Sequence, residues 1–333
     1  MSGTITVSDE PAEARKNLLR IGTRGSDLAL AQTTTVAKAL ARATDCDVHV
    51  VTVVTQGDLS STSLTQLGGE GVFATALRRA LRENRCDLVV HSLKDLPTES
   101  FEDLTIGAIP KRVDPRDALC ARDGLALEQL PVGARVGTGS PRRIAQIVAK
   151  RPDLDVVEIR GNVDTRLARV ADKDVDAVVL AAAGLSRLDR LSAVTEFFEL
   201  SGMPTAPGQG ALALEVRSAD RAGGGMIARA LSAVDHATTH ACVLAEREVL
   251  AQLGAGCAAP IGASALVDDG LLFLTATLYA RDGSKSVTAS HAATPNSLGA
   301  SDLFEAAREV GVRVAAELRQ TGSTLLESIE ATP

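Results

Sequence analysis

The fold is decided by a short strand-to-helix turn that occurs twice, as RIGTRGS at residues 20–26 and as RVGTGSPRR at residues 135–143. In both copies an apolar run ends in glycine and threonine, and a serine precedes a segment with helical apolar spacing. We interpret the repeat as weak internal similarity between two α/β domains. Coincidence in a short glycine-rich turn is the alternative.

Working outward from the two turns, predicted strands and helices alternate. The first cycle comprises a strand at 18–22, a helix at 27–41, a strand at 48–55, a helix at 71–84 and a strand at 87–91. The second comprises a strand end at 135–137, a helix at 141–151, a strand at 156–160, a helix at 163–170 and a strand at 177–180. This alternation is typical of a sheet with helices on its faces.

After residue 210 the pattern changes to that of a smaller α+β domain. It predicts a strand at 211–216, a long helix at 236–253, strands at 261–266 and 271–279, and a final helix at 301–318. The coils at 111–115 and 202–207 are candidate hinges. Residues 1–16 are polar and are predicted to be a disordered lead-in without the apolar run of a signal peptide.

Composition excludes several classes of protein. Of 333 residues 45% are hydrophobic and 23% charged, which is ordinary for a globular protein. A net charge of −7 and only one tyrosine and six phenylalanines argue against general nucleic-acid binding. The longest apolar run, residues 177–185, is too short to cross a bilayer. We therefore expect a soluble, cytoplasmic protein.

The cysteines predict neither a disulfide framework nor a metal site. There are five, with no Cys-x-x-Cys pair. Four lie in apolar or strand-like surroundings, where an inert buried thiol is expected. Cys257 differs, because its loop GAGCAAP at 254–260 consists of small residues that leave room for a bulky adduct. A thiolate there could form a thioether or an acyl enzyme, and a structural loop cysteine is equally compatible.

Arginines follow several of the predicted strands. Ser140 is a good N-cap and Pro141 suits the first helical position, so Arg142 and Arg143 stand on the first turn, where they oppose the helix dipole. That placement is explained if an anion binds there, and a solvated basic face is the alternative. RGNVDTR at 160–166 repeats the pattern, and RGS at 24–26 is a third such turn. Spacing alone does not distinguish carboxylates from phosphates, but no P-loop is present.

Lys94 and Asp95 follow a buried strand, at the carboxyl end where open α/β sheets bind ligands. A carboxylate in this position could serve as a general acid or base, or could stabilise a developing cation. By itself, an aspartate after a strand is more often a turn former.

Together these segments resemble the porphobilinogen deaminase family, in that family's order from about Leu18 to Leu266. The matching signatures are RIGTR at 20–24, VHSLKDLP at 90–97, DPRDA at 114–118, GTGSPRR at 137–143, RGN at 160–162, LAAAG at 180–184, PGQGA at 207–211 and the loop around Cys257. Each motif alone is weak, whereas the ordered set is specific.

The resemblance implies a fold of two similar periplasmic-binding-protein-like α/β domains plus a smaller α+β C-terminal domain. It places domain 1 at 17–112 and 211–229, domain 2 at 113–207 and domain 3 at 230–333. It also implies the reaction: four porphobilinogen molecules are joined head to tail, ammonia is released at each addition, and hydrolysis frees hydroxymethylbilane. A dipyrromethane cofactor, attached to Cys257 through a thioether, is the implied primer.

Site residues are carried over by position. The resemblance makes Asp95 the catalytic carboxylate beside the pyrrole N–H, which becomes cationic during the reaction. It implies cofactor binding by Lys94, Ser140, Arg142 and Arg143, and substrate binding by Arg24, Ser26, Arg160, Arg166 and, less securely matched, Arg187. A monomer is expected, and a transient hand-off to uroporphyrinogen-III synthase follows from the pathway.

Two departures from the family pattern matter. Gln66 and Glu70 stand in the 59–71 loop where lysines are common, so that loop is assigned no binding role. Gly139 replaces a common serine, which removes a hydroxyl donor but leaves the backbone amide.

Two other functions compete: a non-catalytic two-lobed binding protein for a small polycarboxylate, and a cysteine-dependent acyl transferase with a histidine base. The first needs neither Cys257 nor Asp95.

Overall fold

The computed structural model describes residues 3–54, 72–256 and 259–330. The chain forms two compact units, one of Met1–Arg112 with Ala211–His240 and one of Val113–Gly210 with Ala241–Pro333. The first unit contains the predicted first domain, and the second contains both the predicted second domain and most of the predicted third. The division into three domains therefore stays a prediction, and the two units are described separately.

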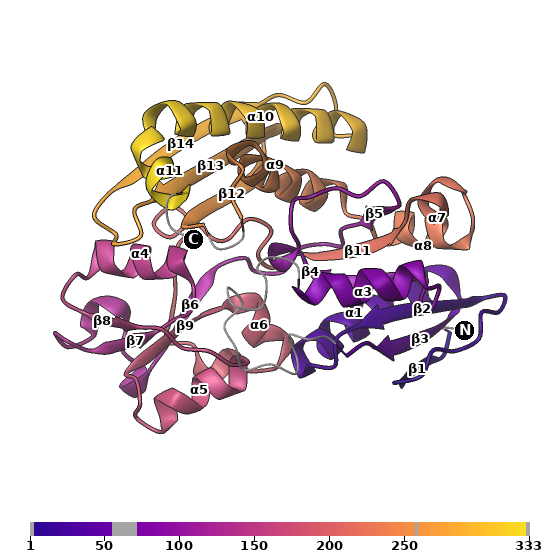
Figure 1. Ribbon diagram of the computed structural model, residues 1–333, viewed down its shortest axis with the longest axis horizontal. Coiled ribbons are helices and arrows are strands. Elements are labelled where there is room, and N and C mark those ends of the chain that lie inside the picture. The colour runs from indigo at the N-terminus through magenta and orange to yellow at the C-terminus, as the bar shows by residue number, and fades with distance from the viewer. Residues whose placement is uncertain (1–2, 55–71, 257–258, 331–333) are drawn as a thin grey trace. The chain divides into compact units, whose positions relative to one another are not determined.

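The first unit is built on a six-stranded sheet (Figure 1). Its strands run in the order β1 (Ile5–Ser8), β3 (Asp47–Thr52), β2 (Leu18–Thr23), β4 (Leu88–Ser92), β11 (Leu212–Arg217) and β5 (Leu104–Ala108). The first four are parallel, and β11 runs antiparallel to both neighbours. Its helices are α1 (Asp27–Thr44), α3 (Val72–Arg82), α7 (Ser218–Ala222) and α8 (Met226–Val234).

Helices cover both faces of this sheet because the strands alternate their side chains between two apolar cores. In β4, Leu88 and Val90 pack in a cluster with residues of α1 and α8, whereas Val89 packs with residues of α3. Successive residues of a strand point to opposite faces. A parallel sheet that is buried on both sides therefore reads as a nearly continuous apolar run, as in the segment 88–90.

The prediction that residues 1–16 are disordered is wrong for Ile5–Ser8, which form a strand. Strand β1 pairs in parallel with β3, from Ile5 opposite Val48 to Ser8 opposite Val51. The strand has only four residues and lies at the edge of the sheet, so its apolar signal is weak. Its partner is some forty residues away in the sequence, and local patterning could not reveal the pairing.

The second unit repeats the topology of the first. Its five-stranded sheet has the order β10 (Glu196–Phe197), β6 (Asp117–Ala121), β9 (Ala177–Ala181), β7 (Arg135–Gly137) and β8 (Asp155–Val157), with helices α4 (Pro141–Lys150), α5 (Val163–Ala171) and α6 (Ala182–Arg187). Parallel strands β8-β7-β9 followed by antiparallel β6 correspond to β3-β2-β4 followed by β11. The internal similarity predicted from the two turns is confirmed.

The second unit also holds the predicted α+β region. Strands β12 (Ile261–Asp268), β13 (Leu271–Tyr279) and β14 (Ser286–Ala293) form an antiparallel sheet, and α10 (Ala300–Thr321) lies across it (Figure 1). Helix α9 (Ala237–Leu253) approaches α10 closely at Gly311. A Cβ at Gly311 would lie 2.5 Å from the Glu248 side chain of α9. A last helix, α11, spans Ser323–Glu330.

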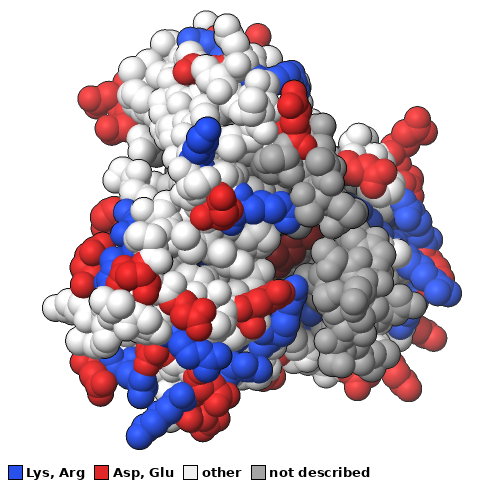
Figure 2. All heavy atoms as spheres, turned by 60° about the vertical axis from the view of Figure 1, so that its left-hand side comes forward, with Lys and Arg blue, Asp and Glu red and all other residues white. Residues whose placement is uncertain are grey.

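Charges of both signs are interspersed over the face drawn in Figure 2. Blue and red side chains lie next to one another there, so the net charge of −7 does not gather into one acidic patch on this face. Within residues 3–54, 72–256 and 259–330, no helix combines the length and the apolar character needed to span a membrane.

Candidate active site

In the first unit, two of the predicted site segments lie at one edge of the sheet. Strands β2 and β4 are parallel neighbours, so the turn with Arg24 and Ser26 and the turn with Lys94 and Asp95 both follow carboxyl ends at the same edge. Ser26 begins α1 as predicted, since its Oγ accepts from the Ala29 backbone N–H at 3.4 Å. The structure thus brings these four predicted residues to one edge.

Asp95 is exposed at the end of the short 3-10 helix η1 (Leu93–Asp95). The turn that carries it is anchored on both sides: Leu93 is fully buried and donates its backbone N–H to the Ala211 carbonyl at 3.1 Å. Gln32 of α1 donates from Nε2 to Ser92 Oγ at 2.8 Å, immediately before η1. The carboxylate is therefore presented to solvent by a rigid support, as a group acting on a ligand requires.

Behind this turn lies a buried polar cluster that the sequence did not reveal. Glu215 Oε2 is 3.0 Å from His91 Nε2, and Glu215 Oε1 accepts from Arg78 Nε at 3.0 Å. Burial raises the pKa of Glu215, but His91 and Arg78 outweigh that effect and hold the pKa below its ordinary value. Glu215 thus stays ionised and ties β11 to β4 and α3.

In the second unit, the predicted turns after β7 and β8 also share an edge. Ser140 caps α4, accepting from the Arg143 backbone N–H at 3.5 Å, and Asn162 caps α5, accepting from Thr165 N at 2.8 Å. The two loops approach so closely that a Cβ at Gly139 would lie 2.8 Å from the Ile159 carbonyl oxygen. Glycine in place of the family's common serine therefore has a steric reason here.

Arg142 and Arg143 surround a single buried carboxylate, Asp117 of β6. Arg142 Nη1 lies 2.8 Å from Asp117 Oδ2, and Arg143 Nη2 lies 2.6 Å from Oδ1. Gln209 Nε2 donates to Oδ1 at 2.8 Å. The exposed fractions are 0% for Asp117, 3% for Arg142 and 5% for Arg143. Burial would raise the pKa of Asp117, but the two guanidiniums hold it far below its usual range.

This arrangement differs from the simple helix-start anion site that the sequence suggested. The two guanidiniums point inward, yet they carry two positive charges against one negative. The Nε atoms of both arginines are buried and have no hydrogen-bond partner among the described residues. A buried donor without a partner is costly, and an excess cation favours a nearby anion. An anion would therefore compensate the excess positive charge of the cluster.

The remaining predicted arginines follow β8 and β9 in the same unit. Arg160 is exposed and pairs with Glu158, and Arg166 Nε donates to the Gly161 carbonyl at 2.8 Å. Arg187 Nη2 donates to the Gly210 carbonyl at 2.9 Å, and burial lowers the pKa of Arg187 to about 10. Burial is the whole cause of that shift, so an incoming carboxylate would stabilise the charged form of Arg187.

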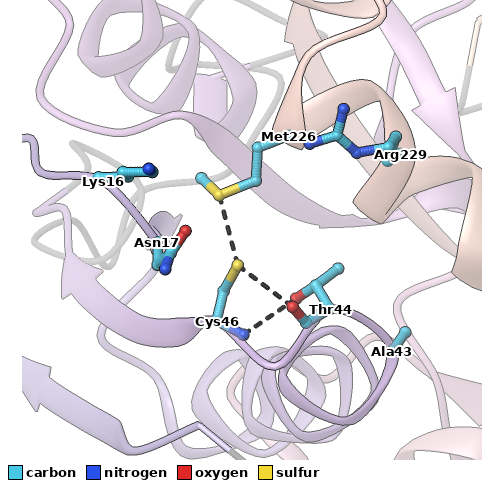
Figure 3. A pocket seen from close by; sticks show the side chains of 7 residues that line it. All are labelled: Lys16, Asn17, Ala43, Thr44, Cys46, Met226 and Arg229. Atoms are coloured by element: carbon cyan, nitrogen blue, oxygen red, sulfur yellow. Dashed lines mark hydrogen bonds between the residues drawn. The ribbon is translucent and has the colours of Figure 1, made fainter.

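Four of the five cysteines are buried, as predicted. Cys46, Cys86, Cys120 and Cys242 are free and buried. Cys46 lines a pocket together with Lys16 and Arg229, and its thiol donates to the Thr44 carbonyl at 3.5 Å and lies 3.3 Å from the Met226 sulfur (Figure 3). Cys257, and Gln66 and Glu70 of the 59–71 loop, lie outside the described residues. Among those described, no cluster of His, Cys, Asp and Glu could hold a metal.

Sequence reasoning missed two polar members of the arginine cluster, although both lie in motifs that it quoted. Asp117 belongs to DPRDA at 114–118 and Gln209 to PGQGA at 207–211. A signal was available in principle, because a buried aspartate at the start of an otherwise apolar strand needs a charged partner. The identity of that partner was not available from local sequence.

Comparison with known proteins gives consistent matches over nearly the whole chain. A family model described as "Porphobilinogen deaminase, dipyromethane cofactor binding domain" matches residues 19–223, and "Porphobilinogen deaminase, C-terminal domain" matches residues 240–320. A protein named porphobilinogen deaminase from Leifsonia xyli subsp. xyli is 66% identical, covering 97% of this chain and 98% of its own length.

Two further relatives carry the same name. The protein from Thermobifida fusca is 50% identical, covering 91% of this chain and 94% of its own, and that from Mycobacterium marinum is 49% identical, covering 92% and 96%. Among solved structures, a putative methionine-binding lipoprotein from Bacillus subtilis aligns with a TM-score of 0.41 at 12% identity, covering 66% of this chain and 91% of that chain.

Proposed function

The chain belongs to the porphobilinogen deaminase family, and from that premise we propose which of its residues carry out the family's reaction. It is a transferase of tetrapyrrole (haem) biosynthesis that joins four porphobilinogen molecules head to tail, releases ammonia and yields hydroxymethylbilane. Its cofactor is dipyrromethane. The competing binding-protein function is not favoured.

Asp95 is the proposed catalytic carboxylate. Its support is the exposed position at the end of η1, on a turn fixed by the buried Leu93 and by the Gln32–Ser92 hydrogen bond. Loss of ammonia from porphobilinogen generates positive charge that is shared with the pyrrole N–H. A fixed carboxylate beside that N–H lowers the barrier because it stabilises charge that develops in the transition state.

The arginines are the proposed binding groups, and one observation carries this assignment. The cluster of Arg142, Arg143 and Asp117 retains a net positive charge and two buried donors without partners among the described residues. Each porphobilinogen brings an acetate and a propionate, so negative charge accumulates as the product lengthens. We propose that Arg142 and Arg143, with Lys94 and Ser140, bind the cofactor, and that substrate is bound by Arg24, Ser26, Arg160, Arg166 and Arg187.

Cys257 is the proposed attachment point. When bound, dipyrromethane supplies the free α-carbon to which the substrate is joined. Exclusion supports the choice of Cys257, because the other four cysteines are buried. Intact mass of the purified protein tests this directly: we expect a surplus of two pyrrole units on the peptide that contains Cys257. Active protein with an unmodified mass would overturn the assignment.

Three accompanying proposals concern the protein's surroundings. Four free buried thiols suit a reducing compartment, which supports a cytoplasmic location. We also propose a monomer, to be checked by light scattering on the eluting protein. A transient hand-off of hydroxymethylbilane to uroporphyrinogen-III synthase would be detected as formation of the second enzyme's product without the lag expected when hydroxymethylbilane first accumulates in solution.

A further inference from the structure

The arginine cluster is attached directly to the α+β part of the second unit. Ala263 of β12 donates its backbone N–H to the Thr205 carbonyl at 2.8 Å, and a Cβ at Gly262 would lie 2.6 Å from the Pro204 carbonyl oxygen. Helix α4 meets the turn after β13 as closely, since a Cβ at Gly283 would lie 2.7 Å from the Ala145 carbonyl oxygen. These backbone approaches define a tight seam between α4, residues 204–205 and strands β12 and β13.

A chain of buried hydrogen bonds crosses this seam and ends on Arg142. Tyr279, the last residue of β13, accepts at its hydroxyl from Gln146 Nε2 at 3.2 Å. Gln146 also donates to the Pro204 carbonyl at 2.8 Å, and its Oε1 accepts from Arg142 Nη1 at 2.7 Å. Arg142 Nη1 donates to the same Pro204 carbonyl at 3.0 Å. Gln146 and Tyr279 are 2% and 7% exposed.

These contacts fix the orientation of both side chains. The Gln146 amide is oriented unambiguously, because its oxygen faces a guanidinium and its NH₂ group faces two oxygen acceptors. Arg142 is thereby held at one nitrogen, Nη1, by Gln146, Pro204 and Asp117. A long arginine side chain has much rotamer freedom to lose, so groups that hold it beforehand reduce the entropic cost of binding an anion.

We propose that Tyr279 and Gln146 are positioning residues for Arg142. Through Tyr279, strand β13 of the α+β region holds the guanidinium ready for the carboxylates of dipyrromethane. The proposal rests on the binding role of Arg142 proposed above. Neither residue touches the cofactor in this proposal, and both act through Arg142 alone.

The test measures cofactor loading. Cofactor-free protein, produced in a host that makes no porphobilinogen, is mixed with porphobilinogen, and the appearance of the mass surplus of two pyrrole units is followed in time. The variants are Tyr279→Phe, Gln146→Leu, the double variant and Arg142→Gln. Thr275→Val is the matched control, because it removes a hydroxyl of the same strand that bonds to Ser290 Oγ at 2.8 Å and not to Gln146.

We expect Tyr279→Phe to slow loading roughly two- to tenfold, the value of the one buried hydrogen bond that it removes. Gln146→Leu should slow loading at least as much, because Gln146 makes three such bonds. The control should load at the wild-type rate. Because both residues act through one contact, the double variant should be no slower than the slower single variant. In the Arg142→Gln background, Tyr279→Phe should cause no further slowing, an outcome that a merely structural tyrosine would not produce.

The two proposals fail in distinguishable ways. If Arg142→Gln itself loads normally, the binding role of Arg142 is wrong and the positioning role falls with it. Two other outcomes would show that only the positioning role is wrong. In the first, Arg142→Gln slows loading but Tyr279→Phe loads like the control. In the second, Tyr279→Phe slows loading by the same factor whether residue 142 is arginine or glutamine.

Discussion

The replacement of Asp117 by asparagine should destabilise the second unit strongly. The side chain has no exposed surface, and its two oxygens lie 2.8 and 2.6 Å from Arg142 and Arg143. Asparagine has nearly the same shape but no charge, so two buried guanidiniums would lose their only counter-charge in the cluster. Removal of one partner from a buried ion pair costs about 3–5 kcal/mol, and we expect a loss of unfolding free energy in that range.

Urea unfolding followed by tyrosine fluorescence measures this loss of unfolding free energy in the second unit. The chain has no tryptophan and a single tyrosine, Tyr279, which lies in the network around Arg142. Asp153→Asn provides the matched control, because Asp153 pairs with Arg151 at 2.6 Å but its side chain is 32% exposed. Exposed pairs contribute little, so the control should shift the urea midpoint only slightly.

The loss of unfolding free energy caused by Asp117→Asn should also depend on pH and should become smaller at low pH. The pKa of Asp117 is depressed in the folded protein, so its contribution is fully present above the unfolded value of about 4 and declines as the pH falls below it. The difference between wild type and Asp117→Asn should therefore be constant above about pH 5 and shrink below about pH 4. A loss no larger than that of the control, or a difference that persists unchanged down to pH 3, would refute the reasoning.

Three further predictions concern the proposed site. Asp95→Asn should retain the cofactor mass while turnover falls by about two orders of magnitude or more, measured as ammonia released; near-normal turnover would remove Asp95 from its role. Arg187→Leu should raise the KM for porphobilinogen severalfold with little change in kcat, whereas an unchanged KM would exclude substrate binding by Arg187. Gly139→Ala should lower the melting temperature, since its Cβ would lie 2.8 Å from the Ile159 carbonyl oxygen, and an unchanged melting curve would show that the loops can separate at no cost.

Most of the alternating core of the fold could be predicted from sequence, because helices and buried strands leave local signals. The helix predicted at 27–41 is α1, and the strand predicted at 271–279 is β13. Two strands that were not predicted, β5 and β6, are held by pairing across long sequence separations. A third, β14, pairs with the preceding strand β13. The antiparallel strand β6 has Asp117 as its first residue, which interrupts the apolar pattern that would have revealed it.

The candidate site was predicted less completely, because contacts between residues that are distant in the sequence leave no local signal. Capping by Ser140 is a local property and is confirmed. The burial of Arg142 is not local: Gln146 lies on the same helix, but Asp117 and Pro204 come from distant parts of the sequence that only the folded chain brings together. Local chemistry therefore predicts candidate residues, while the folded structure determines which way their side chains point.

The buried charges themselves argue for function over stability. A cluster of two arginines and one aspartate in the interior is weakly stabilising at best, and apolar side chains of similar volume would often be as stable or better. Arg142 and Arg143 moreover occupy a helix start, where the dipole disfavours cations. A chain selected for stability alone would have no reason to place uncompensated positive charge there. Its presence is explained if the missing negative charge arrives with the ligand, so that the second unit is completed electrostatically only when carboxylates bind. Loading should therefore stabilise this unit most where Arg142, Arg143 and Asp117 meet.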